Sequence, residues 1–117
     1  MATDFRNGLF PRRGRDDYEG FLWLKRVFDK GRASHAGTIH DYIYPCGMDK
    51  GVFERWGITP AEFDGALATA TTDEAILAWV RSRVSDERRE KANRWLLDEK
   101  VANLDKQDAE EGVVAAR

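Results

Sequence analysis

The chain has 117 residues, of which 42 % are hydrophobic and 34 % charged, with four tryptophans and six phenylalanines. This apolar content is enough for the core of one domain and excludes a chain that is disordered throughout. The formal net charge of −2 excludes a strong overall field that would attract nucleic acid or an anionic membrane.

Two features of the sequence bear on the compartment. No apolar segment approaches the roughly 18 residues of a spanning helix, and the first residues lack the charged and then apolar pattern of a secretory signal. The single cysteine, Cys46, cannot form an internal disulfide, as is typical of a reducing compartment. We therefore expect a cytoplasmic protein that does not span a membrane.

Residues 1–16 are predicted to form an extended basic arm. The arm contains glycine and proline and has no steady apolar period. We expect Phe5, Leu9 and Phe10 to attach it to the core. Its basic residues are Arg6, Arg12, Arg13 and Arg15.

A helix is predicted from Asp16 or Asp17 to about Ser34, because apolar residues recur at helical spacing after an acidic start. Its apolar positions are Phe21, Leu24, Val27, Phe28 and Gly31. Gly37 is typical of a left-handed helix stop, and residues 38–47 predict a loop or a short extended piece.

Two helices of the middle region have clear signals at their ends. Asp49 is predicted to cap a helix of about two turns that stops at Gly57. The sequence Thr59-Pro60-Ala61-Glu62 is a capping box with proline at the first helical position. The apolar faces consist of Val52, Phe53 and Trp56 in the first helix and Phe63, Ala66, Leu67 and Ala70 in the second.

Two more helices complete the predicted domain. Thr72 or Thr71 caps one of them, and Ser85 opens the last, highly charged helix. Ala92, Trp95 and Leu96 of the last helix pack inward, whereas Leu97, Val101 and Leu104 lie on a different arc. This second stripe indicates a kink or a wider buried face in preference to a contact with a second subunit. From Asp105 to residue 117 we expect a frayed tail.

Five short helices joined by short turns predict an all-α fold, a compact orthogonal bundle in one domain of residues 17–104. A small extended hairpin near residues 38–45 is the main exception that the pattern allows.

The run from Asp29 to Asp49 follows the pattern D-K-x-R-A-x-x-x-G-x-x-x-x-Y-x-Y-x-C-x-x-D. The chain resembles, in this run, a family of small bacterial proteins catalogued as a domain of unknown function. The resemblance continues more weakly at the helix stop at Gly57 and in the helix that starts at Thr72 and contains Trp79. The resemblance covers most of the chain after the arm. It implies a small helical bacterial protein and carries no activity, cofactor or partner.

Side chains capable of chemistry are concentrated between residues 29 and 49, and two interpretations of them stay open. In the structural one, they pair with the backbone of an irregular loop while the tyrosine rings pack. In the functional one, they form a pocket for a small polar or anionic ligand, with Arg32 and Lys30 binding charge and Tyr42 or Tyr44 orienting it. The candidates are Asp29, Lys30, Arg32, His35, His40, Asp41, Tyr42, Tyr44, Cys46 and Asp49.

Other kinds of site are not favoured. The spacing H-x4-H-D-x4-C of His35, His40, Asp41 and Cys46 matches no standard zinc arrangement, and the chain has no nucleotide-binding or hydrolase motif. Cys46 as a nucleophile requires an adjacent base such as His40. We therefore expect no metal and no other cofactor.

Residues 49–70 have the outline of a helix-turn-helix, but their charges argue against nucleic acid as a partner. The second helix, residues 59–70, carries Glu62 and Asp64 and no basic residue that could read a groove.

The leading hypothesis is a non-enzymatic interaction or small-ligand-binding module that uses the 29–49 segment. One alternative is a small enzyme that uses Cys46, His40 or His35. Another is an oligomeric structural protein that associates through the stripe at Leu97, Val101 and Leu104. The partner is thus a small molecule, a second copy of the chain or another protein.

Overall fold

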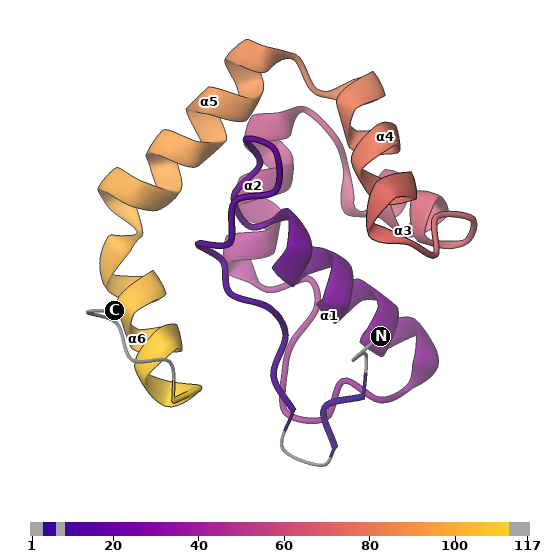
Figure 1. Ribbon diagram of the computed structural model, residues 1–117, viewed down its shortest axis with the longest axis vertical. Helices are drawn as coiled ribbons and strands as arrows, with labels where there is room; N and C mark the ends of the chain where they lie inside the picture. Colours follow the sequence, from indigo (N-terminus) through magenta and orange to yellow (C-terminus); the bar gives the residue numbers. More distant parts are fainter. Residues whose placement is uncertain (1–3, 7–8, 113–117) are drawn as a thin grey trace.

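The capping signals of the sequence coincide with most helix ends of the protein. The computed structural model describes residues 4–6 and 9–112, and this part of the chain is all-α, as expected (Figure 1). Six helices are present in this part of the chain, one more than expected. They are α1 (Leu24–Ala36), α2 (Gly47–Trp56), α3 (Pro60–Leu67), α4 (Asp73–Arg83), α5 (Asp86–Arg94) and α6 (Val101–Glu110), with a π-helical turn (Trp95–Glu99) between the last two.

The predicted caps between Gly37 and Ser85 are confirmed at several helix ends. Gly37 and Gly57 end α1 and α2 with φ angles of 74° and 80°, in the left-handed region that glycine adopts at low cost. At the start of α3, the Glu62 N–H donates to Thr59 Oγ1 and the Thr59 N–H donates to Glu62 Oε1, at 3.1 and 2.8 Å. The side chains of Thr72 and Ser85 likewise accept backbone N–H groups at the starts of α4 and α5.

Two predicted helix starts are wrong. Helix α1 begins at Leu24 and not at Asp16 or Asp17, because Glu19, Gly20 and Trp23 have positive φ angles that no helix accommodates. Helix α2 begins at Gly47, with Cys46 as its cap. Asp49 is the third helical residue. Its N–H donates to Cys46 Sγ, and its carboxylate accepts the Cys46 N–H at 2.9 Å.

The C-terminal region also differs from the expected frayed tail. The π-helical turn ends at Lys100, where the backbone leaves helical geometry, so the predicted last helix is interrupted here, in agreement with one of the two explanations that its second stripe allowed. The chain then continues as α6 to Glu110, beyond Asp105. It stays ordered to that point because Leu104 packs in the core and buried Asp108 binds two arginines of the arm.

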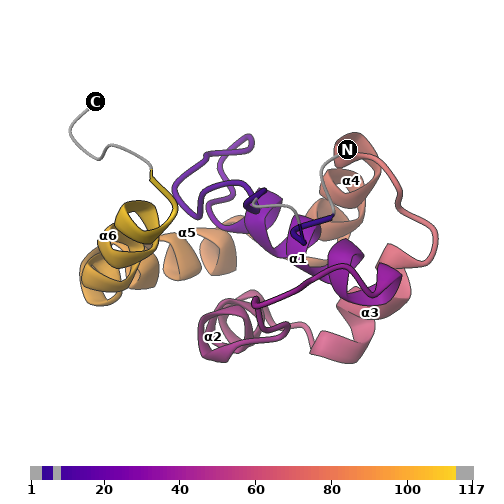
Figure 2. The same ribbon diagram turned by 90° about the horizontal axis from the view of Figure 1, so that it is seen from below.

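Helix α1 lies between two groups of helices, with α5 and α6 on one side and α3 and α4 on the other (Figures 1 and 2). An aromatic core fills the space between the elements. Phe53 contacts both Trp56 and Phe63, with ring centroids 6.1 and 5.0 Å apart. Gly51 lets α2 approach the π-helical turn, because a Cβ atom at this position would collide with the ring of Trp95.

Residues 38–45 form a loop, and the described residues contain no strand there, so the allowed hairpin is absent. The arm runs beside α1 and the Phe5 N–H donates to the Thr38 carbonyl at 2.9 Å (Figure 1). None of the described helices has the length and the apolar character needed to cross a bilayer. The orthogonal arrangement of the helices stays a prediction.

Candidate functional site

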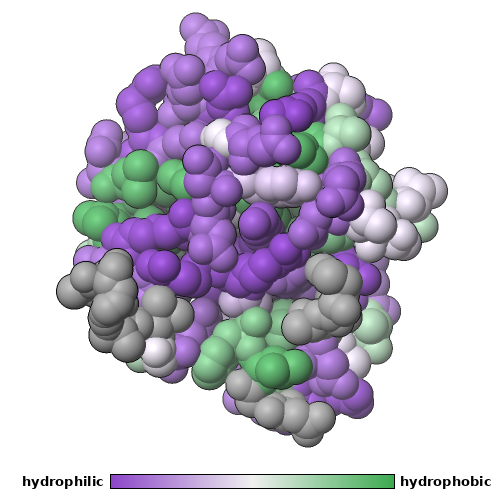
Figure 3. Space-filling view, in the orientation of Figure 1, coloured by the Kyte–Doolittle hydropathy of each residue, from purple (hydrophilic) through white to green (hydrophobic). Residues whose placement is uncertain are grey.

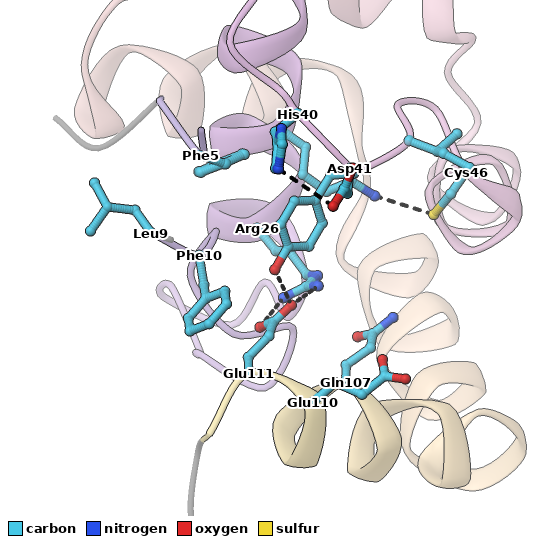
Figure 4. Close-up of a pocket in the computed structure, with 13 residues that line it drawn as sticks. Phe5, Leu9, Phe10, Arg26, His40, Asp41, Cys46, Gln107, Glu110 and Glu111 are labelled. Atoms are coloured by element: carbon cyan, nitrogen blue, oxygen red, sulfur yellow. Dashed lines mark hydrogen bonds and ion pairs between the residues drawn. The ribbon is translucent and has the colours of Figure 1, made fainter. Parts of the chain in front are cut away.

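A pocket of about 600 Å³ opens where four segments meet: the arm, α1, the loop after α1 and the end of α6 (Figure 4). A space-filling view shows a hydrophobic area at the lower end of this face, and a second one at its left edge (Figure 3). The pocket is lined by Phe5, Leu9, Phe10, Arg26, Lys30, His40, Asp41, Tyr42, Ile43, Cys46, Gln107, Glu110 and Glu111.

A buried ion pair forms the centre of the pocket wall. The Arg26 guanidinium donates to both carboxylate oxygens of Glu111, at 2.6 and 3.0 Å, and the Tyr42 hydroxyl donates to Glu111 Oε2 at 2.9 Å (Figure 4). Burial raises the pKa of Tyr42 and the hydrogen bond to Glu111 raises it further, so the phenol stays a donor. The pKa of Arg26 is raised because its pairing with Glu111 outweighs the effect of burial. This pair connects α1 to the end of α6.

A second buried cluster surrounds Asp49, which is fully buried at the start of α2. Its carboxylate accepts hydrogen bonds from Lys30 Nζ and from the indole of Trp23, both at 2.8 Å. Lys30 Nζ also lies 3.3 Å from Cys46 Sγ. Because a buried charge is costly without a partner, Asp49 and Lys30 stabilise each other and fix the start of α2 against α1.

Five of the ten predicted residues line the pocket: Lys30, His40, Asp41, Tyr42 and Cys46. They come from α1 and the loop, as the sequence indicated. His40 has a φ of 57°, in the left-handed region, and its Nε2 lies 3.4 Å from Asp41 Oδ2. Whether these five residues bind a ligand stays a prediction.

The other five predicted residues do not line the pocket and contact groups elsewhere, and Nη1 of Arg32 is buried without a hydrogen-bond partner among the described residues. Asp29 binds Arg12 of the arm at 2.8 Å, and the Arg32 guanidinium lies over the Phe28 ring, 5.1 Å from its centroid. Asp64 of α3 accepts the Tyr44 hydroxyl at 2.7 Å and lies 3.4 Å from His35 Nε2. These groups connect elements of the fold, as does Asp49. The ten candidate residues therefore do not all meet in the one pocket that the functional interpretation describes.

Sequence reasoning missed the residues that the arm and α6 contribute. We expected Leu9 and Phe10 to attach the arm to the core, but they are 51 and 48 % exposed, and only Phe5 is buried. Leu9 and Phe10 are adjacent large apolar residues in a polar arm, and this pattern was the signal in the sequence that could have indicated a binding surface. No local pattern indicates that Glu111 pairs with Arg26, because 85 positions separate them.

Two polar atoms at the pocket are buried and have no hydrogen-bond partner among the described residues. One is Arg26 Nε, a donor, and the other is Gln107 Oε1, an acceptor. Most buried polar groups in proteins are paired, so unpaired ones at a pocket indicate where a ligand can gain a hydrogen bond.

Two further observations concern alternative sites. In the part of the chain that the structure describes, no three His, Cys, Asp or Glu side chains gather as a metal site. A second pocket, of about 290 Å³, lies beside α5, where the Arg55 guanidinium stacks 4.0 Å from the centre of the Trp95 ring. That guanidinium fills the space over the ring, so the pocket between arm and α6 is the stronger candidate.

Sequence comparison places the chain in a family. No curated protein matches it. The family model described as a domain of unknown function, DUF5069, matches residues 9–116, from the pocket residue Leu9 through all six helices. Because this match covers nearly the whole chain, the protein belongs to the DUF5069 family.

Proposed function

We propose that the protein is a non-enzymatic binding module whose pocket between arm and α6 takes a small molecule with an apolar body and a hydrogen-bonding end. The observation that carries the proposal is the distribution of exposed apolar side chains. Of the five large hydrophobic residues that are exposed in the described chain, three surround this pocket: Leu9, Phe10 and Ile43. Exposed apolar side chains that gather around one cavity are typical of binding sites.

The polar groups of the wall support the same proposal. The Arg26–Glu111 pair and Tyr42 are held in place by their mutual hydrogen bonds before any ligand arrives, which reduces the entropic cost of binding. Arg26 Nε and Gln107 Oε1 supply a free donor and a free acceptor. Both atoms are shielded from solvent in side chains that line the pocket, so a hydroxyl or amide on the ligand pairs with either one after a small movement of that side chain.

The experiment is a ¹H–¹⁵N NMR titration of the full chain with benzyl alcohol, a neutral probe with a ring and a hydroxyl. We expect the largest shifts at amides of residues 40–43 and 107–111. Ile43→Asp places a charge at the apolar mouth and should abolish these shifts. Leu97→Asp makes the same change on an exposed residue away from the pocket and should leave them intact. Shifts that are absent, or that persist in Ile43→Asp, contradict the proposal.

The alternatives from the sequence have less support. In the enzyme alternative, Cys46 acts with His40 or His35. Cys46 Sγ accepts from the Asp49 N–H and from Lys30, whereas His40 and His35 lie near Asp41 and Asp64, so the contacts of the described residues pair this thiol with neither imidazole. Leu104 is 2 % exposed, which reduces the proposed oligomer stripe to Leu97 and Val101. A cytoplasmic location stays part of the proposal, supported by the single thiol.

A further inference from the structure

The charges that line the pocket differ in whether a ligand can use them. The cations, Arg26 and Lys30, are each 3 % exposed and are paired with Glu111 and Asp49. The carboxylates at the mouth are accessible: the Asp41 side chain is 90 % exposed, and Glu110 is exposed without an ion-pair partner among the described residues. A ligand that enters therefore meets acidic groups first.

An anionic ligand gains little from the two buried cations. To bind Arg26 or Lys30 with full strength, it would have to displace a carboxylate that is itself buried and hydrogen-bonded. Displacement would leave that carboxylate without a partner, at a cost that exceeds the gain. The expectation of an anionic ligand held by Arg32 and Lys30 is thus disfavoured, since Arg32 lies outside the pocket.

The aromatic side chains favour a cation as well. Phe5, Phe10 and Tyr42 line the pocket. Phe5 is 2 % exposed and packs edge to face on Tyr42, and the Arg26 guanidinium lies over the Tyr42 ring, 5.8 Å from its centroid, so Phe10, which is 48 % exposed, offers the most accessible ring. The face of an aromatic ring attracts a positive charge, most strongly where water is partly excluded. An accessible aromatic ring beside accessible carboxylates is a combination that binds ammonium groups.

We propose that the pocket selects an organic cation, in which a protonated or quaternary amine is joined to an apolar body. This inference rests on the proposed function and specifies the chemical class of its ligand. The apolar body contacts Leu9, Phe10 and Ile43, and the amine lies near Glu110 and Asp41.

The test compares three probes that share a benzyl or phenyl group: benzyltrimethylammonium, benzyl alcohol and benzoate. NMR titrations of the full chain at neutral pH and low salt give a Kd for each. We expect benzyltrimethylammonium to bind at least about threefold more tightly than benzyl alcohol, and benzoate to bind most weakly. Benzoate binding as tightly as the ammonium probe overturns the inference and leaves the proposed function standing. If none of the three shifts the pocket amides, the proposed function fails and the inference fails with it.

A matched pair of variants separates a local charge effect from the net charge. Glu110→Gln removes one carboxylate at the mouth and should reduce the preference for benzyltrimethylammonium over benzyl alcohol by about twofold or more. Glu87→Gln makes the same change on an exposed residue of α5 that does not line the pocket, and should leave the preference unchanged. An equal effect of both variants contradicts the inference, because the preference would then follow the net charge.

Discussion

The core around α1 to α4 and the interface that joins the arm to α1, α4 and α6 are held together differently. Aromatic and aliphatic side chains fill the core, whereas arginines of the arm bind acidic groups across the interface. Arg12 binds Asp29 and Asp73, at 2.8 and 2.7 Å, and Asp108 accepts from both Arg13 and Arg15. Close packing leaves few cavities in the core, and the pocket lies where charged pairs join the segments. Changes to the two regions should therefore have distinct effects.

The largest expected effect comes from a core substitution. Phe53→Ala removes a ring that is 1 % exposed and contacts two other aromatic residues. We expect it to lower the free energy of unfolding by about 3–5 kcal/mol, because it leaves a cavity that the surroundings cannot fill. Urea denaturation followed by circular dichroism measures the change. A loss below about 1 kcal/mol would show that this core is loosely packed.

Breaking the buried Arg26–Glu111 pair, which connects α1 to the end of α6, should cost less. Glu111→Gln removes the counterion of buried Arg26 but keeps one oxygen that accepts a hydrogen bond, and we expect a loss of about 2–3 kcal/mol. The double variant Arg26→Met/Glu111→Leu removes both charges and should recover part of this loss. The same denaturation measurement tests both. If the double variant is no more stable than Glu111→Gln, the unpaired charge of Arg26 is not what destabilises the single variant.

Lower pH should loosen the interface before the core. The hydrogen bond and charge of Arg12 lower the pKa of Asp73, and Arg13 does the same for Asp108, both below the ordinary value of 3.8. A carboxylate with a lowered folded-state pKa stabilises the fold above its unfolded pKa and loses this contribution as pH falls through the folded value. Hydrogen exchange in α6 should thus increase below about pH 4, while core amides stay protected. Asp108→Asn should show fast α6 exchange already at neutral pH, and slow exchange in that variant would contradict this account.

The smallest expected effects come from two tyrosines. Tyr42→Phe and Tyr44→Phe each remove one hydroxyl hydrogen bond, to Glu111 and Asp64, and each should cost about 1 kcal/mol. Only Tyr42→Phe should accelerate hydrogen exchange in α6, because Tyr44 binds α3. Equal acceleration in both variants would mean that the two regions are coupled.

The two regions also differed in how far the sequence predicted them. Periodicity and caps predicted the core helices and the ends at Gly57, Thr59 and Thr72, since these signals are local. The start of α1 was missed because the left-handed conformation of Trp23 depends on its burial and on the Gly14 carbonyl, which accepts its N–H at 2.8 Å.

The pocket was predicted only on the side that the loop contributes. His40, Asp41, Tyr42 and Cys46 are neighbours in the sequence, so their concentration was visible. The opposite wall comes from α6 and the arm, and its position depends on ion pairs between residues far apart in the chain. No residue pattern within one segment indicates which arginine binds which carboxylate.

The most direct test of the binding pocket is a search for intermolecular NOEs between benzyl alcohol and the methyl groups of the full chain. We predict NOEs from the probe ring to the methyl groups of Leu9 and Ile43 at the mouth of the pocket. NOEs confined to Leu97 and Val101, which are the exposed large apolar residues of the described chain that lie outside the pocket, would contradict the account and move the binding surface to the region between α5 and α6.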